Sequence, residues 1–443
     1  MGRMHRAIAR SEDANPAVVT LDSGVRVVVC PLRHLATASV SVFVRCGSEH
    51  ESARQNGISH FVEHMAFKGT RTRDCQRINL DAERLGAEVN AHTDKDHTAF
   101  HMRGLARDAP AFVRMLGDIV RECCFPAAEL VRERDVLLHE YADDKDDAMG
   151  VAFRLFDVAC FGEHAAARPV IGSRPNIRRF TRRELVAWVR RQYTGANTIV
   201  GVAGDVDADE IVADARAAFG GMPRGRDNVV AAPAYLGGIR SRRLADSGQA
   251  HVVMGFATPS LSGEHEAFVV AAALLGEGMS SPLLDQLRER RGLVYHAECW
   301  VDVKDSYGQF VIEASTTLQR LDEYFGEVGR LLRMQIAHTD PIGLERARNA
   351  IEVRSLADRE SPAQLLELAA LDLFALGRVR SPAEVSAAIR AVRPDTVRET
   401  FARMLDARPA VAIAGNVDGR EAKRFARRLT EVDAEFVRRS RRR

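Results

Sequence analysis

Short stretches of alternating apolar and polar positions open each half of the chain. The stretches with this period of two, which is typical of β-strands, are "VRVVVC" (25–30), "TASVSVFVRCG" (37–47) and "AHVVMGFATP" (250–259). Longer stretches follow them in which apolar positions recur at helical spacing, and these predict amphipathic helices. Strands followed by helices predict α+β layers, with helices packed on one face of a mainly antiparallel sheet.

One unit of this pattern occurs twice. The sequences "VGVAGDVDADEIVADARAAF" (200–219) and "VAIAGNVDGREAKRFARRL" (411–429) both run from an apolar strand through Ala-Gly-x-Val-Asp into a helical pattern. Their glycines, Gly204 and Gly415, lie 211 positions apart. A helical stretch precedes each copy, "RRELVAWVRRQY" (182–193) and "DTVRETFARML" (395–405). Recurrence at about half the chain length indicates duplication.

The segment between the copies, "GGMPRGRDNVVAAPAYLGG" (220–238), is rich in glycine and proline and is typical of a linker. We therefore expect an N-terminal half at residues 1–220, a linker at 221–240 and a homologous C-terminal half at 241–443. Two such α+β halves can close around a cavity like a clamshell.

Composition narrows the class of protein. The 443 residues are 46% hydrophobic and 28% charged, with a net charge of +2, which gives no case for nucleic-acid binding. The terminal "RRSRRR" is interpreted as a solvated tail. We expect no membrane span, since no apolar run reaches the roughly 20 residues that one needs. The first 20 residues lack the apolar core of a secretory signal, and the seven cysteines form no CxxC pair. These features favour a cytoplasmic protein, and the small share of lysine, five of 63 basic residues, suggests a bacterial source.

Two histidines and a glutamate lie within five positions of "HFVEHMAFKGT" (60–70). On a helix, His60 and His64 share one face one turn apart, and Glu63 lies at its edge. Asn56 and Gly57 offer a start for that helix and Gly69 an end. Two such imidazoles can hold zinc, and a neighbouring carboxylate can accept a proton from water. The alternative is an ordinary amphipathic helix that carries two histidines.

A third metal ligand must come from another element. The predicted helix "AAELVRERDVLLHEYADDKDD" (127–147) carries Glu133 and Glu140 two turns apart on one face. Its neighbour His139 points about 100° away from Glu140 and is not expected in the site. Solvated helix charges are the alternative interpretation for any single glutamate here.

The motif HxxEH, with these two glutamates, resembles the pitrilysin, insulysin and mitochondrial-processing-peptidase family of zinc metallopeptidases. Glu140 follows His64 by 76 positions and Glu133 precedes Glu140 by seven, as in that family. The resemblance implies one zinc ion per chain, held by His60, His64 and Glu140. It also implies Glu63 as general base and Glu133 as a residue that orients a ligand.

The resemblance extends along nearly the whole chain. "GSEHES" (47–52) resembles the family's Gly-Ser stretch, and "NAHTDKDHTAF" (90–100) resembles its strand beside the cleft. The latter implies Asn90, Ala91, Thr93 and Phe100 as substrate-binding residues, with phenylalanine where tyrosine is common. "LLGEGMSSPLLDQLRERRGLVY" (274–295) implies that Arg288 and Tyr295 reach the scissile bond from the C-terminal half. From the residues alone, Tyr295 would be a packed strand residue.

The function implied is that of a zinc endopeptidase that cuts short or unfolded peptides inside a closing chamber. Two alternatives stay open: a non-catalytic core subunit of the same fold, and a dedicated peptidase that matures one ribosomal precursor peptide. The resemblance implies a homodimer or a heterodimer with a related subunit. Asp94 and Asp96 suggest basic substrates, although solvated loop charges explain them equally well.

Overall fold

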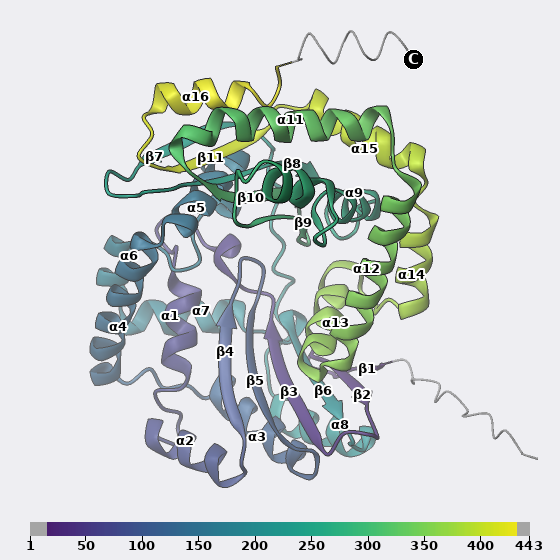
Figure 1. Cartoon of the computed structure of the whole chain (residues 1–443). Coiled ribbons are helices and arrows are strands. Elements are labelled where there is room, and N and C mark those ends of the chain that lie inside the picture. The colour runs from purple at the N-terminus through teal and green to yellow at the C-terminus, as the bar shows by residue number, and fades with distance from the viewer. Residues whose placement is uncertain (1–15, 432–443) are drawn as a thin grey trace, which may run out of the picture.

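Two β-sheets, one in each half of the chain, form the framework of the computed structural model, which describes residues 16–431 (Figure 1). The sheets have the strand orders β1-β2-β6-β3-β5-β4 and β7-β11-β8-β10-β9. Neighbouring strands are antiparallel except for the β2–β6 and β7–β11 pairs. The expected α+β class is therefore confirmed. The strands are β1 Ala17–Thr20, β2 Arg26–Pro31, β3 Thr37–Val44, β4 Glu88–Thr93, β5 Thr98–Leu105, β6 Thr198–Gly204, β7 Gly238–Arg243, β8 Ala250–Thr258, β9 Ala297–Val303, β10 Gly308–Thr316 and β11 Ala410–Gly415.

Helices follow the strands in both halves, as the apolar periodicity predicted. The helices of the N-terminal half are α1 Ile58–Ala66, α2 Cys75–Arg84, α3 Ala109–Arg121, α4 Ala127–Asp146, α5 Ala148–Phe161, α6 Arg174–Arg179, α7 Arg182–Gln192 and α8 Ala208–Phe219. Those of the C-terminal half are α9 Glu266–Gly276, α10 Pro282–Leu284, α11 Leu321–Ala337, α12 Pro341–Glu360, α13 Pro362–Leu376, α14 Pro382–Ala391, α15 Pro394–Asp406 and α16 Gly419–Arg427. A π-helical turn, η5 Asp285–Arg290, continues α10.

The repeated sequence unit occupies equivalent places in the two sheets. β6 lies between β2 and β3, and β11 lies between β7 and β8, with the same strand directions. Both repeated glycines end their strand against a neighbouring strand. A Cβ on Gly204 would lie 2.6 Å from the Ala38 Cβ, and one on Gly415 would lie 2.9 Å from the Ala250 Cα. Close backbone approach explains why both copies carry glycine there.

Each half contributes one helix to the sheet of the other half. α5, from the N-terminal half, packs on the C-terminal sheet in a cluster that includes Phe156, Val253 and Ala412. α13, from the C-terminal half, packs on the N-terminal sheet in a cluster that includes Val28, Phe43 and Leu366. The sheets are therefore covered on both faces, whereas the sequence pattern predicted helices on one face. This exchange is visible in Figure 1, where α5 lies below the upper sheet and α13 lies beside β6.

The turns of two equivalent hairpins, β4–β5 and β9–β10, meet between the halves. The Lys304 ammonium forms an ion pair with the Asp94 carboxylate at 2.6 Å. Beside it, Lys95 pairs with Asp157 of α5 at 2.5 Å, and Arg45 pairs with Asp305. Charged side chains thus join the halves next to the two exchanged helices.

Several other sequence expectations fall in this framework. Residues 221–237 form neither helix nor strand, and β7 begins at Gly238. The expected single strand at 90–100 is wrong, because residues 94–97 form the turn of a hairpin. The basic tail and most of the N-terminal stretch lie outside the described residues.

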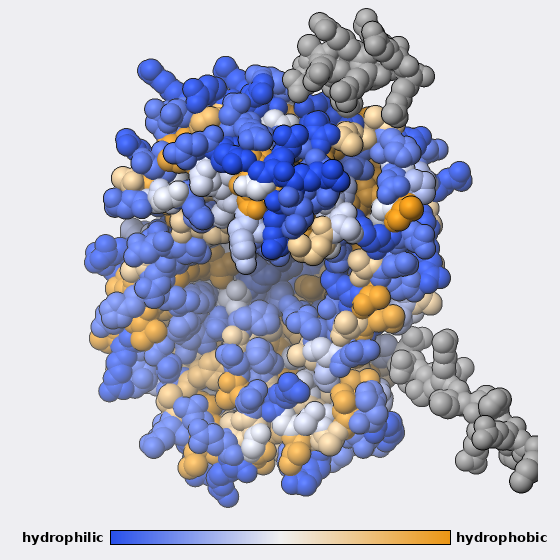
Figure 2. Space-filling view, viewed as in Figure 1, coloured by the Kyte–Doolittle hydropathy of each residue, from blue (hydrophilic) through white to orange (hydrophobic). Residues whose placement is uncertain are grey.

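The described surface is predominantly hydrophilic on the face shown in Figure 2, where it is hollowed between the two halves. In residues 16–431, no helix combines the length and the apolar character that crossing a membrane requires.

Candidate metal centre

The start of α1 is fixed by the buried carboxylate of Glu51. Its two oxygens accept hydrogen bonds from the backbone amides of Gly57 and Ser59, at 2.7 and 2.8 Å. These amides have no partner within the helix, and a carboxylate at a helix N-terminus is also favoured by the helix dipole. The sequence argument did not assign Glu51 a role, because a glutamate in a loop carries no pattern that identifies it as a cap.

Gly57 precedes the helix with a φ of 96°, in the left-handed region. A Cβ at this position would lie 2.8 Å from the Cα of Gly172. Two glycines therefore allow the loop before α1 to contact the segment before α6. This contact and the Glu51 cap fix the position of the helix that carries the HxxEH motif.

The structure brings His60, His64 and Glu140 together. The two imidazole centroids lie 4.7 Å apart on α1, and α4 packs beside them. His60 Nε2 lies 3.6 Å from Glu140 Oε1, and His64 Nε2 lies 3.5 Å from Glu140 Oε2. One ligand atom from each residue lies within 4.8 Å of the others. Exposed His139, on the same helix as Glu140, is not in the cluster.

These three residues fit a zinc ion. Zinc bonds of about 2.0–2.1 Å in a tetrahedron place ligand atoms about 3.4 Å apart, close to the separations found here. Two imidazole nitrogens and one carboxylate form a common zinc-binding set. Burial, together with the neighbouring His64, lowers the pKa of His60 to about 3. Its imidazole is therefore neutral at physiological pH, as a metal ligand must be.

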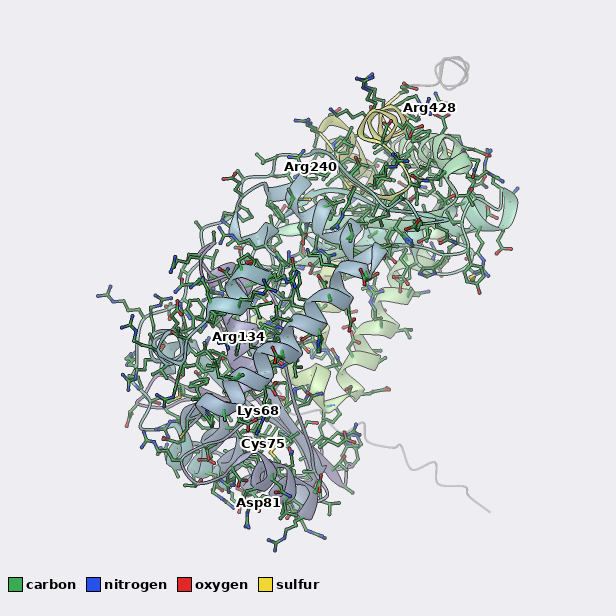
Figure 3. The ribbon with its side chains drawn as sticks, turned by 90° about the vertical axis from the view of Figure 1, so that its left-hand side faces the viewer. Lys68, Cys75, Asp81, Arg134, Arg240 and Arg428 are labelled. Carbon is green, nitrogen blue, oxygen red and sulfur yellow. The ribbon has the colours of Figure 1, made fainter. Side chains whose placement is uncertain are left out.

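Glu133 lies where it can orient His64. It is 6% exposed, and its Oε2 lies 3.2 Å from His64 Nδ1. An N–H donated from Nδ1 to this carboxylate leaves Nε2 free to bind a metal. The other oxygen of Glu133 pairs with Lys68 at 2.8 Å. Lys68, which the sequence argument did not identify, is labelled in Figure 3 together with Arg134 of α4.

Glu63 lies beside the cluster and is held by Thr93. The Thr93 hydroxyl donates a hydrogen bond of 2.7 Å to Glu63 Oε2. Burial is the main cause that raises the pKa of Glu63, and Glu140 adds to it. A carboxylate with a raised pKa is a stronger proton acceptor, which suits a general base. Thr93 therefore contacts the expected base, a contact that the sequence argument did not include.

The N-terminal sheet ends in β4, an edge strand that pairs only with β5 among the described strands. Asn90 and Ala91 lie on β4, where an extended peptide can add to the sheet. Phe100 does not fit the substrate-binding role that was expected. It is 0% exposed, and its interior strand β5 pairs with neighbours on both sides. Its ring packs against Phe67 and Tyr193 instead.

Arg288 and Tyr295 are held together within the C-terminal half. The Arg288 guanidinium lies over the Tyr295 ring, 5.2 Å from its centroid. Tyr295 is 85% exposed and therefore not a packed strand residue. No hydrogen bond or ion pair within residues 16–431 connects either of them to Glu63 or to the metal cluster. The structure thus forms the pair without bringing it to the site.

The two acidic residues of the β4–β5 turn, Asp94 and Asp96, both have charged partners within the molecule. Asp94 pairs with Lys304, and Asp96, which is 6% exposed, lies 2.7 Å from His97 Nδ1. Neither carboxylate is therefore available to select basic substrates.

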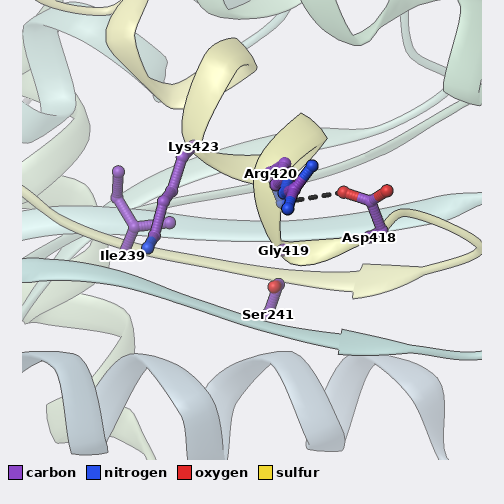
Figure 4. A pocket seen from close by; sticks show the side chains of 6 residues that line it. All are labelled: Ile239, Ser241, Asp418, Gly419, Arg420 and Lys423. Carbon is purple, nitrogen blue, oxygen red and sulfur yellow. Dashed lines mark hydrogen bonds between the residues drawn. The ribbon is translucent and has the colours of Figure 1, made fainter.

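A surface depression in the C-terminal half lies outside this centre. It has a volume of about 440 Å³ and is lined by Ile239, Ser241, Asp418, Gly419, Arg420 and Lys423 (Figure 4). Asp418 caps α16 by accepting hydrogen bonds from the backbone amides of Arg420 and Glu421, at 2.7 and 2.9 Å. Its carboxylate has a structural role there.

Comparison with protein families gives two matches that follow one another along the chain. The family described as "Insulinase (Peptidase family M16)" matches residues 27–174, and "Peptidase M16 inactive domain" matches residues 179–350. The three candidate ligands and Glu63 lie in the first segment, and Arg288 and Tyr295 lie in the second.

Related proteins cover most of the chain. An uncharacterized zinc protease of Mycobacterium leprae, ML0855, is 36% identical over 80% of both chains. The mitochondrial-processing peptidase subunit beta of Lentinula edodes is 26% identical over 94% of this chain and 93% of its own.

Solved structures share the fold. A protease from Helicobacter pylori is similar with a TM-score of 0.81 and 19% identity, covering 90% of this chain and 98% of its own. A chain of complex III from Candida albicans is similar with a TM-score of 0.81 and 15% identity, covering 93% and 99%.

Proposed function

Because this chain belongs to the insulinase family of peptidases, family M16, we propose that it is a zinc-dependent endopeptidase for short or unfolded peptides. The observation that carries the proposal is the convergence of His60, His64 and Glu140 beside Glu63. A zinc ion bound by the three ligands would polarise a peptide carbonyl and make a water molecule more acidic.

Glu63 has the role of general base and then of general acid. Its carboxylate accepts a proton from the attacking water and passes that proton to the leaving amine. The Thr93 hydroxyl holds one carboxylate oxygen at 2.7 Å, so the other oxygen is the one free to take the proton. Partial burial, which raises the pKa of Glu63, brings its basicity closer to neutral pH.

The edge strand β4 has the role of aligning the substrate. An extended peptide pairs its backbone with β4 at Asn90 and Ala91, next to Thr93 and hence next to Glu63. Backbone pairing requires an extended segment, which a folded protein does not offer. Short and unfolded peptides are therefore the substrates that this arrangement selects.

Arg288 and Tyr295 have the role of stabilising the developing oxyanion from the C-terminal half. As donors they would contribute roughly 2–4 kcal/mol to the transition state. Since no hydrogen bond or ion pair within residues 16–431 connects them to the centre, the proposal requires the halves to move closer when substrate binds.

A pair of chains is the proposed assembly, and a homodimer is favoured because this chain carries both the ligand set and the Arg288–Tyr295 pair. The related processing peptidase is named as a subunit, which makes a heterodimer with a related chain the second possibility. A purely structural subunit does not require three metal ligands and a general base. The presence of all four residues therefore favours an enzyme.

The proposal is tested by removing the metal from the purified chain. Wild type is assayed on a quenched peptide library before chelation, after chelation and after zinc is restored. We expect cleavage to be lost with the metal and recovered with it. Tyr295→Phe should lower kcat and leave zinc content unchanged. Cleavage that continues in the metal-free protein would contradict the proposal, and zinc binding without any cleavage would favour the structural subunit.

A further inference from the structure

A second cluster of histidines and a carboxylate lies on the other face of β4. Side chains alternate between the two faces along a strand, so Thr93 points toward Glu63 while His92 points toward the face that α13 covers. His92 is paired in register with Ala99, which belongs to the apolar cluster under α13. On this face, His92, His97 and Glu367 each place one ligand atom within 4.8 Å of the others.

The geometry of this cluster is similar to that of the first centre. His92 Nε2 and His97 Nε2 both lie 3.8 Å from Glu367 Oε1. In the first centre, the corresponding nitrogen–oxygen distances are 3.5 and 3.6 Å. These separations are too long for hydrogen bonds and leave space for an ion between the three atoms. The two imidazoles meet edge to face, with centroids 5.4 Å apart.

His97 provides an independent indication of a ligand. It is 2% exposed, and its Nδ1 lies 2.7 Å from the Asp96 carboxylate. Its Nε2 is buried and has no hydrogen-bond partner within the described part of the chain. A buried nitrogen without a partner is costly. Metal-binding histidines are commonly held by a carboxylate through one ring nitrogen while the other nitrogen binds the metal. His97 has this arrangement, with Asp96 at Nδ1 and with Nε2 directed toward Glu367.

We propose that His92, His97 and Glu367 form a second metal site, which takes a zinc-like transition-metal ion and connects the β4–β5 hairpin to α13. Two imidazoles favour zinc, cobalt or nickel over magnesium or calcium, which prefer oxygen ligands. Asp94 is not a ligand, because Lys304 already pairs with it. The His92 side chain is 41% exposed, so an ion could reach the cluster from solvent on this side.

The site would connect the two halves of the molecule. His92 lies on β4 and His97 in the turn between β4 and β5, whereas Glu367 lies on the helix that the C-terminal half contributes to this sheet. An ion bound here would add a second link between the halves, besides the Lys304–Asp94 pair. Its role is structural, because Glu63 and the first centre lie on the opposite face of β4.

The test is the number of cobalt ions that the full chain binds, measured by elemental analysis and by the visible absorption of tetrahedral cobalt. We expect about two per wild-type chain and about one in Glu367→Gln. His92→Gln, at the partly exposed edge strand, is a second variant with the same expectation. The matched control is Glu298→Gln, which removes an exposed carboxylate from the cluster of His296, Glu298 and Glu313 and should still bind about two.

The His60→Ala/His64→Ala variant separates this proposal from the proposed peptidase centre. It should retain about one cobalt ion, and that ion should raise the thermal unfolding temperature. Adding Asp96→Asn should weaken its binding by roughly 10- to 100-fold. If wild type binds only one ion and Glu367→Gln still binds that ion, the second site is overturned. If wild type binds only one ion, and that ion is lost in Glu367→Gln but kept in the His60→Ala/His64→Ala variant, the first centre is overturned instead.

Discussion

At the scale of single residues, the His64 imidazole faces one carboxylate from each of its two nitrogens. Nδ1 lies 3.2 Å from Glu133, and Nε2 lies 3.5 Å from Glu140. Both carboxylates come from α4, two turns apart, which is why a spacing of seven residues is needed. Lys68 compensates the charge of the buried Glu133. Glu133 therefore contacts the ligand His64 rather than the proposed metal position.

Replacing Glu133 by glutamine should weaken zinc binding while the ligands remain. The amide is a poorer acceptor for the His64 Nδ1 proton, so we expect zinc affinity to fall roughly 10- to 100-fold. Competition with a chromophoric chelator measures the affinity. Glu129→Gln, one turn earlier on the same helix and paired with Arg132, is the control. Equal affinity in both variants would show that Glu133 does not orient His64.

The pairing of His60 with His64 could be predicted because its information is local, whereas Glu140 was assigned as a ligand through the family resemblance. A spacing of four positions places His60 and His64 on one helix face whatever surrounds them. Phe100 was assigned a substrate-binding role through the resemblance alone, and its complete burial does not fit that role. Glu51 was missed since its role depends on backbone amides that become neighbours only after folding.

At the scale of elements, α1 depends on the contact between two glycine-containing loops. Gly57 has a left-handed backbone conformation and touches Gly172. Both the conformation and the lack of space for a Cβ atom therefore require glycine at this position. Glu51 then caps the helix directly behind this contact. The orientation of both histidines follows from this start of the helix.

Gly57→Ala should therefore lower the free energy of unfolding and disturb the metal centre. Gly86→Ala is the matched control, because Gly86 also has a positive φ of 63° but a Cβ added there would have nothing within 4 Å. We expect Gly86→Ala to cost about 1–2 kcal/mol from conformation alone. Gly57→Ala should cost about 1–3 kcal/mol more because of the clash. Equal costs in urea unfolding would show that the loops can separate freely.

The existence of the helices and strands could largely be predicted from the sequence, but their boundaries less so. Apolar periodicity identified the strands at 25–30, 37–47 and 250–259 and the helix at 127–147. The resemblance implied a strand at 90–100 where the chain forms a hairpin, and the turn "DKDH" has no glycine or proline to mark it in the sequence. Side-chain pairs between Asp94, Asp96, His97 and Lys304 stabilise this turn instead.

At the scale of the whole molecule, the exchange of α5 and α13 makes each half depend on the other. The halves are also joined where the turns of two equivalent hairpins meet, at the Lys304–Asp94 pair. The Lys304 side chain is 14% exposed and that of Asp94 is 40% exposed. This pair is thus partly protected from solvent and from screening by salt.

Lys304→Met should destabilise the molecule by removing the cation from among several carboxylates. We expect the free energy of unfolding to fall by roughly 1–3 kcal/mol, between the values for exposed and buried ion pairs. The control is Lys423→Met in the exposed depression of Figure 4. Unfolding in urea at low and high salt measures both. A loss no larger than that of the control would mean that the Lys304–Asp94 pair does not help to join the halves.

The duplication was predictable from the sequence, but the exchange of helices was not. Ala-Gly-x-Val-Asp repeats are visible without a structure and mark equivalent strands. Whether α13 covers its own sheet or the other one depends on contacts between residues such as Phe43 and Leu366, which are far apart in the chain. Local patterns contain no information about such pairs.

The central claim is that Glu63 performs proton transfer beside a metal held by other residues. The most direct measurement is kcat/KM of Glu63→Gln on a quenched peptide, with bound zinc measured in the same sample and Glu83→Gln of exposed α2 as control. The account predicts full zinc content, a kcat/KM lower by roughly 10²- to 10⁴-fold, and an unaffected control. Cleavage at the wild-type rate by zinc-loaded Glu63→Gln would contradict it.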